Sequence, residues 1–208
     1  MISLFLNTSS KMFNAAIVKD TVVLDSIYEN YGKDLSKEAL YKISIMLENN
    51  KLTPHDIDEI VCVRGPGSFT GLRIGVTIAK TMAYFLNKKL YSTSSLAVMA
   101  TSVKGEIIVP IIDARRGYVY GAIYNEDYHV ILEESYIKLE DIIEKAKMYS
   151  DKPVFVTLDE FDFETNTFSP DLNNFYKQNL KKEENSMTFV PNYLKKTEAE
   201  EKLNDSRA

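Results

Sequence analysis

Short apolar runs separated by polar residues make up the first third of the chain. Three of these runs are too short for helices, at residues 2–6, 15–18 and 21–24. Runs of this length with polar breaks between them predict three strands that are joined as hairpins. Residues 36–50 then carry apolar side chains at helical spacing, and a further apolar run covers residues 60–63. This order predicts a helix that leads the chain into a fourth strand.

The chain continues with a loop and a second helix, and a similar order of elements then starts again. The loop covers residues 64–69, and the helix after it runs from residue 70 to residue 86. A short strand at 90–91 and a short helix at 94–102 end this half. The second half is predicted to hold strands at 107–112, 118–124 and 130–137, a helix at 139–149 and a strand at 154–156.

This repetition predicts a duplicated α/β fold. Each half has three strands, a helix and a strand, although the halves share no visible sequence repeat. Two such halves side by side are typical of the actin-like, or ribonuclease-H-like, architecture. We therefore expect an N-terminal subdomain at residues 1–102 and a reduced C-terminal subdomain at 103–208. Residues 159–188 show no clear period, and we expect irregular structure there with a short helix near 172–180.

The loop between strand and helix is rich in glycine but fits neither common nucleotide-binding pattern. It reads Gly65-Pro66-Gly67-Ser68-Phe69-Thr70-Gly71-Leu72-Arg73. A P-loop needs lysine after its last glycine, where Leu72 stands. The dinucleotide pattern needs glycine where Thr70 stands. We interpret the glycines as residues that allow a tight turn before a helix, which Ser68 or Thr70 caps. An anion bound at the start of this helix stays open as an alternative.

The helix at 70–86 is apolar nearly all round. One stripe holds Leu72, Val76, Ala79, Ala83 and Leu86, and a second holds Ile74, Ile78, Met82 and Phe85. A helix of this kind must be covered on nearly every side. Because the helix at 36–50 also has apolar residues on more than one face, we expect the pair to expose an apolar patch that binds a partner. The residues predicted for this interface are Ile43, Met46, Leu47, Ile74, Ile78 and Met82.

Composition and charge narrow the classes of function. Of the 208 residues, 45% are hydrophobic and 26% are charged, as in an ordinary globular protein with a core. The formal net charge is −5, which opposes a stand-alone nucleic-acid binder because such binding depends on neutralising phosphates. The chain has no apolar run near the roughly 20 residues that span a membrane, and its start does not resemble a signal peptide. A single cysteine excludes a disulfide framework, and we expect a cytoplasmic protein.

Few residues are candidates for catalysis or for binding a metal or cofactor. Actin-like ATPases hold adenosine with a glycine-rich turn in the second half, but the last of the eight glycines here is Gly121. The two histidines, His55 and His129, are not spaced like metal ligands. Cys62 lies inside an apolar run and is interpreted as a core residue. We expect no catalytic centre, no metal and no cofactor.

Asp113 is the best remaining catalytic candidate. It lies at the end of a predicted strand, where active-site carboxylates are often found. However, Arg115 and Arg116 beside it would neutralise its charge as readily as they would activate it. We interpret Asp113 as a turn-forming aspartate that precedes a hairpin.

Four segments of the chain match one known family in order. The most specific is residues 65–76, Gly-Pro-Gly-Ser-Phe-Thr-Gly-Leu-Arg-Ile-Gly-Val. The supporting segments are Ser94-Ser95-Leu96, Asp113-Ala114-Arg115-Arg116-Gly117-Tyr118-Val119-Tyr120 and Pro191-Asn192-Tyr193-Leu194. Together they resemble the TsaB (YeaZ) family, and the resemblance runs from Ile2 to about Ala199.

The resemblance implies an actin-like fold that has no catalytic centre of its own. It implies a partner subunit for the catalytic paralogue TsaD and the ATPase TsaE, in a complex that transfers threonylcarbamoyl to adenosine 37 of tRNA. It also implies a homodimer when the protein is alone, pairing through first-subdomain helices, and contact with tRNA only through the complex. The competing interpretations are an actin-like enzyme, either a kinase or a peptidase, and a stand-alone nucleic-acid binder.

One position departs from the family pattern. The first strand of the family usually ends Asp-Thr-Ser or Asp-Thr-Ala, whereas this chain has Asn7-Thr8-Ser9. In actin-like ATPases this aspartate helps to hold the magnesium of the nucleotide, and a neutral asparagine is a weaker partner for a hard cation. We therefore expect that the pure protein does not bind Mg-ATP tightly.

Overall fold

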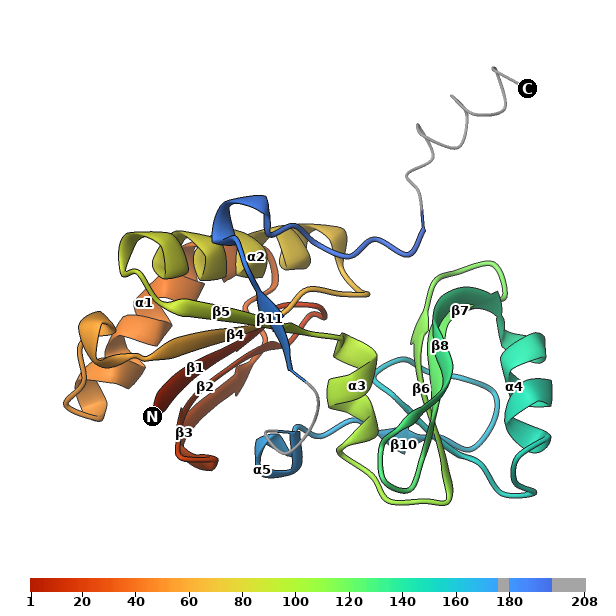
Figure 1. Ribbon diagram of the computed structural model, residues 1–208. Helices are drawn as coiled ribbons and strands as arrows, with labels where there is room; N and C mark the ends of the chain where they lie inside the picture. Colours follow the sequence, from red (N-terminus) through yellow and green to blue (C-terminus); the bar gives the residue numbers. More distant parts are fainter. Residues whose placement is uncertain (176–179, 196–208) are drawn as a thin grey trace, which may run out of the picture.

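The computed structural model describes residues 1–175 and 180–195, and their strands form two sheets (Figure 1). The first sheet has the strand order β11-β5-β4-β1-β2-β3. Its strands are β1 (Ile2–Asn7), β2 (Phe13–Lys19), β3 (Val22–Glu29), β4 (Glu59–Val63), β5 (Lys89–Thr93) and β11 (Lys181–Glu183). Strands β1, β2 and β3 are antiparallel hairpins, whereas β4 and β5 run parallel to β1 because a helix crosses over before each of them.

The second sheet repeats this plan with the strand order β10-β9-β6-β7-β8. Its strands are β6 (Ile107–Asp113), β7 (Tyr118–Asn125), β8 (Val130–Lys138), β9 (Val154–Thr157) and β10 (Asn166–Thr167). Strands β6, β7 and β8 are antiparallel, and β9 returns parallel to β6 after a helix. The duplicated α/β fold that the sequence predicts is therefore confirmed.

Helices α1 (Leu35–Asn49) and α2 (Phe69–Phe85) lie side by side against one face of the first sheet (Figure 1). Successive side chains of a strand point to opposite faces, so alternate residues of β1 meet these helices. Leu4 and Leu6 belong to one core cluster with Ile43 of α1 and with apolar residues of α2. This cluster forms the core of the first half.

The other face of the first sheet packs against the second half. The connecting helix α3 (Ser95–Ala100) lies between the two sheets (Figure 1). Phe5, which points away from α1 and α2, packs in one cluster with Leu96 of α3 and with Ile108 of the second sheet. Helix α4 (Leu139–Lys147) covers the outer face of that sheet. The two halves therefore share a continuous apolar contact.

The last described segment returns to the first half. Strand β11 pairs antiparallel with β5, and the 3-10 turn after it, Ser186–Thr188, contacts α2. Phe189, whose side chain is 2% exposed, enters the core cluster under α1 and α2. The ammonium group of Lys80 on α2 donates to the carbonyl oxygen of Met187 at 3.1 Å. Helix α2 is thus covered by the sheet, by α1 and by this segment.

Most elements agree with the sequence prediction, and the two long helices of the first half start and end within one residue of it. Residues 159–188 differ in that they contain the short strands β10 and β11, whereas helix α5 (Leu172–Phe175) begins where a short helix was expected. Residues 176–179 of the expected helix at 172–180 lie outside the described residues. The division into subdomains after residue 102 stays a prediction, and β11 lies in the first sheet. None of the described helices has the length and apolar character needed to cross a membrane.

Candidate functional site

The glycine-rich loop lies directly on the end of strand β1. The backbone N–H of Ser68 donates to the carbonyl oxygen of Ser9 at 2.6 Å. Gly67 has a φ of 151°, and a Cβ atom there would lie 2.2 Å from the same oxygen. The peptide bond between Gly65 and Pro66 is cis. Gly67 is therefore required both by its backbone conformation and by the close approach of Ser9.

The start of α2 is equally close to β1. The hydroxyl of Ser68, not that of Thr70, caps the helix by accepting from the N–H of Gly71 at 3.2 Å. A Cβ on Gly71 would lie 2.0 Å from the carbonyl oxygen of Thr8, and a Cβ on Gly75 would lie 2.2 Å from the Thr8 hydroxyl. The glycines of α2 are needed for room rather than for an unusual backbone angle.

The same packing determines which backbone N–H groups could hold an anion at the start of α2. A phosphate at a helix N-terminus is held by backbone N–H groups that have no protein acceptor. The N–H groups of Ser68 and Gly71 already donate to Ser9 and Ser68. These contacts join the loop to the end of a strand, as the tight-turn interpretation of the sequence expects, and an anion at the N–H groups of Phe69 and Thr70 stays open as an alternative.

Two other matched segments hold the loop from outside. The N–H of Ser95, at the start of α3, donates to the carbonyl oxygen of Gly65 at 2.9 Å. The hydroxyl of Ser95 donates to the carbonyl oxygen of Pro66. The N–H of Asn192 donates to the carbonyl oxygen of Arg64 at 2.7 Å. Segments that lie far apart in the sequence therefore meet around one loop.

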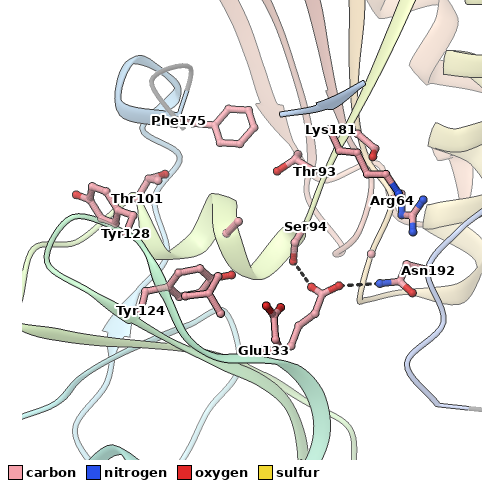
Figure 2. A pocket seen from close by; sticks show the side chains of 15 residues that line it. Arg64, Thr93, Ser94, Thr101, Tyr124, Tyr128, Glu133, Phe175, Lys181 and Asn192 are labelled. Atoms are coloured by element: carbon pink, nitrogen blue, oxygen red, sulfur yellow. Dashed lines mark hydrogen bonds between the residues drawn. The ribbon is translucent and has the colours of Figure 1, made fainter. Parts of the chain in front are cut away.

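A cavity of about 270 Å³ lies beside the loop, between the two halves (Figure 2). Its wall includes the aromatic rings of Tyr124, Tyr128 and Phe175 and the charged side chains Arg64, Glu133, Glu134 and Lys181. The guanidinium of Arg64 lies 3.5 Å from the carboxylate of Glu183 on β11. Apolar and charged groups thus share this cavity.

Glu134 on β8 bridges the two halves at the wall of this cavity. Its carboxylate accepts a hydrogen bond from the hydroxyl of Ser94, and a second from the side-chain amide of Asn192 at 2.7 Å (dashed lines in Figure 2). Burial raises the pKa of Glu134, whereas these two hydrogen bonds and the charge of Arg64 act in the opposite direction. The sequence analysis missed Glu134, because two adjacent glutamates in a strand look like an exposed pair.

A second cavity, of about 220 Å³, lies between the end of β1 and the ends of β6 and β9. Its polar lining residues are Asn7, Ser9, Ser10, Lys11, Ser68, Ser95 and Asp159. The carboxamide oxygen of Asn7 accepts from the N–H of Ser9 at 3.0 Å and from its hydroxyl at 2.7 Å. The position where the family usually has aspartate is therefore used to hold the turn after β1.

The predicted second motif forms the turn between β6 and β7. The carboxylate of Asp113 accepts from the backbone N–H of Arg115 at 2.8 Å, as expected of a turn-forming aspartate. Arg115, Arg116 and Gly117 have φ angles of 68°, 57° and 76°. The N–H of Asp113 in turn donates to the carboxylate of Asp159 at 2.8 Å. Asp113 and both arginines are exposed, and their functional role stays a prediction.

The described part of the chain holds no group of three His, Cys, Asp or Glu side chains placed to bind a metal ion. Cys62 is fully buried in β4, and burial raises the pKa of its thiol. His55 is exposed in a 3-10 turn, and His129 is exposed just before β8. These side chains lie where the sequence analysis expects ordinary core and surface residues.

The six residues predicted for the interface do not form an exposed patch. Ile43, Met46, Leu47 and Ile78 are buried, and Ile74 and Met82 are half-buried against the same cluster. The segment around Phe189 covers α2 where no neighbour was expected. Three of the six residues, Ile43, Leu47 and Met82, nevertheless line a groove between α1 and α2, and their place in an interface stays a prediction. The two helices expose other apolar residues, namely Leu40, Tyr41, Tyr84 and Phe85. An apolar groove of about 310 Å³ runs between α1 and α2 beside them.

Known proteins resemble this chain in sequence and in fold. Residues 29–201 match the family model of TsaD, tRNA N6-adenosine threonylcarbamoyltransferase. The tRNA threonylcarbamoyladenosine biosynthesis protein TsaB of Bacillus subtilis is 33% identical, over 74% of this chain and 69% of its own length. Its Escherichia coli namesake is 29% identical over the same shares. The structure of YeaZ from Pseudomonas aeruginosa superimposes on this chain with a TM-score of 0.72 at 20% sequence identity, and the match covers 93% of this chain and 99% of that protein. This similarity shows that the two proteins share a fold.

Replacing Gly71 with alanine should destabilise the protein. Its Cβ would lie 2.0 Å from a backbone oxygen, so α2 must move away from β1. We expect the free energy of unfolding, measured by urea denaturation, to fall by about 1–3 kcal/mol. The control is Thr77→Ala on the exposed side of α2, which should change stability by no more than about 0.5 kcal/mol. Helix propensity alone would make Gly71→Ala stabilising by up to about 1 kcal/mol, so stabilisation would refute the close approach.

Replacing Glu134 with glutamine should change how stability depends on pH. A raised folded-state pKa means that the contribution of Glu134 is complete below the ordinary glutamate value of about 4.3 and is lost as pH rises through the raised value. Glutamine does not titrate, so the stability of Glu134→Gln relative to wild type should increase over this window. Urea unfolding at a series of pH values measures the difference. A difference that falls with pH would contradict this origin.

Proposed function

The chain belongs to the TsaB (YeaZ) family, and we propose that it is a non-catalytic subunit of the machinery that makes threonylcarbamoyladenosine in tRNA. The observation that supports this proposal is that the candidate catalytic side chains make local hydrogen bonds within turns. Asn7 binds Ser9, and Asp113 binds the backbone of Arg115. Asn7 and Asp113 lie at strand ends, where catalytic residues are often found, but both side chains stabilise turns instead.

Among the described residues, Glu134 is the carboxylate at the cavity wall whose pKa is raised by burial, which makes it a candidate for an enzymatic role. A half-buried carboxyl with a raised pKa is a feature that acid–base catalysts share with structural hydrogen-bond networks. Both oxygen atoms of Glu134 accept hydrogen bonds from segments that also hold the glycine-rich loop. We therefore interpret Glu134 as a residue that links the two halves by hydrogen bonds and not as a catalytic acid.

We propose that the partner subunits are TsaD and TsaE, that the protein is cytoplasmic, and that it forms a homodimer when alone. The groove between α1 and α2 is the surface we assign to TsaD and to the homodimer. Its lining includes the exposed side chains of Leu40 and Phe85, and aromatic residues such as Phe85 dominate the affinity of many interfaces. One patch used in both ways makes the two pairings mutually exclusive.

Replacing Phe85 with glutamate tests this role. The Phe85 side chain is 78% exposed, so the variant should fold normally. In the complex the new carboxylate would be buried without a partner, which should weaken binding to the TsaD protein of the same organism by about 100-fold or more. The measurements are co-purification with that protein and formation of threonylcarbamoyladenosine on unmodified tRNA.

The matched control is Met148→Glu, because the Met148 side chain is 76% exposed but lies at the end of α4 in the other half. This variant should bind and support modification like wild type. A Phe85→Glu protein that still binds TsaD and supports modification would show that the groove is not the interface. A wild-type chain that adds nothing to modification by TsaD and TsaE would refute the proposed function itself.

A further inference from the structure

Aromatic rings and cations form a small cluster at the start of α2. The rings of Phe69 and Tyr193 are stacked, with centroids 4.5 Å apart and planes at 26°. The guanidinium of Arg73 lies 4.0 Å from the centre of the Phe69 ring, and its Nε–H donates to the hydroxyl of Tyr193 at 3.0 Å. Phe69 and Tyr193 are 39% and 38% exposed. Ring surface is therefore open to solvent here.

A second cluster of the same kind lies on the other half of the molecule. Tyr118 of β7 and Tyr136 of β8 are stacked with centroids 4.7 Å apart and planes at 10°. The ring centroids of Tyr120 and Tyr136 lie 5.8 Å apart, and the ammonium group of Lys195 lies 5.0 Å from the centre of the Tyr136 ring. Since Tyr193 and Lys195 are two residues apart, one short segment connects the two clusters.

We call this surface the aromatic strip, made of Phe69, Arg73, Tyr118, Tyr136, Tyr193 and Lys195. The β6–β7 turn adds the exposed Arg115 and Arg116 at one end. Carboxylates also lie near the strip: Glu140 lies 3.4 Å from the ammonium of Lys138, and Glu134 accepts hydrogen bonds from Ser94 and Asn192. In a chain of net charge −5, the strip nevertheless places Arg73 and Lys195 directly over aromatic rings.

We propose that the aromatic strip is a contact surface for an unpaired stretch of tRNA. Unpaired bases stack on aromatic side chains and on arginine, while arginine and lysine neutralise the phosphates between them. The strip offers both kinds of group on both sides of the cleft between the halves. This inference rests on the proposed function, in which tRNA is the substrate, and it assigns a surface of this subunit to that substrate.

A protein partner is the competing occupant of the strip. Protein interfaces have an apolar centre in addition to tyrosine and arginine. Phe69 and Val190, three residues before Tyr193, are exposed apolar side chains in the part of the strip that lies on the first half. On the described residues of β7 and β8, the one large apolar side chain that is well exposed is Val130, at the far end of β8 from Tyr136. Ring faces with flanking cations fit a nucleic acid better than they fit a second apolar surface. Because the whole chain is acidic, we expect the strip to act beside the TsaD subunit rather than alone.

The test is tRNA binding by the full chain in complex with the TsaD protein of the same organism. The probe is a fluorescently labelled, unmodified tRNA transcript, and fluorescence anisotropy gives Kd over a series of KCl concentrations. Tyr136→Leu, which removes a stacking face, should weaken binding about ten-fold. Its control Tyr136→Phe keeps the ring and should bind like wild type. Arg116→Gln should lower the slope of log Kd against log salt by about one.

Further controls make the outcome decisive. Lys152→Gln removes an exposed charge from the turn after α4 and should leave the affinity unchanged. If Tyr136→Leu does not fold, Arg116→Gln decides the matter, because Arg116 lies exposed in a turn. Unchanged affinity and salt slope in the folded variants would overturn the proposal. Weaker capture of TsaD with unchanged tRNA affinity would make the strip a protein interface and would also overturn it.

Failure of the proposed function is distinguishable from failure of the strip. Capture of TsaD by the wild-type chain is measured first, and its absence counts against the proposed function. The same variants are then compared for tRNA binding by the chain alone at low salt, where phosphate contacts are strongest. If the wild-type chain alone binds the transcript at low salt, a loss of binding in Tyr136→Leu but not in Tyr136→Phe supports the strip there too, and equal binding by both overturns it.

Discussion

The close contact between α2 and the end of β1 decides where the glycine-rich loop and its helix lie. Gly67, Gly71 and Gly75 bring the loop and the helix so close that any side chain there would collide with Thr8 or Ser9. The N–H of Ser68 donates to the carbonyl oxygen of Ser9 at this contact. The signature glycines therefore fix the position of α2, and the position of α2 fixes the groove between α1 and α2.

The segment from β11 to Lys195 is the second element that decides the architecture. It adds a strand beside β5, buries Phe189 in the first core and reaches Glu134 through Asn192. The same segment contributes Tyr193 and Lys195 to the aromatic strip. A stretch that lies near the end of the sequence thus ties both halves together, and it couples the glycine-rich loop to the surface that we assign to tRNA.

Local patterns predicted most of the fold, and contacts between distant residues account for the rest. The strands and long helices follow from periods of two and 3.6 residues, which each segment carries within itself. Strand β11 carries no such period in three residues, and it exists because Lys182 meets Tyr91 far away in the sequence. The burial of most of the expected patch has the same cause, since nothing near α2 in the sequence indicates that Phe189 covers it.

The candidate site was predictable to a similar extent. The glycine-rich loop, Asn7 and Asp113 were found from sequence, because glycine spacing and strand ends are local signals. The role of Glu134 depends on Ser94 and Asn192, which come from two other segments. Pairing of Tyr118 with Tyr136 likewise needs the register of β7 against β8. Neither arrangement leaves a mark that one stretch of sequence could show.

If this subunit contributes contacts and not chemistry, removal of the charged groups from the second cavity should leave the modification reaction unchanged. Lys11 and Asp159 are the charged side chains that line that cavity. The measurement is the rate of threonylcarbamoyladenosine formation in a reaction reconstituted with TsaD, TsaE and a Lys11→Ala/Asp159→Asn chain. We predict a rate within about two-fold of wild type, because electrostatic contributions to chemistry are worth far more than that. A loss of about 100-fold with the complex intact would show that the cleft takes part in the reaction.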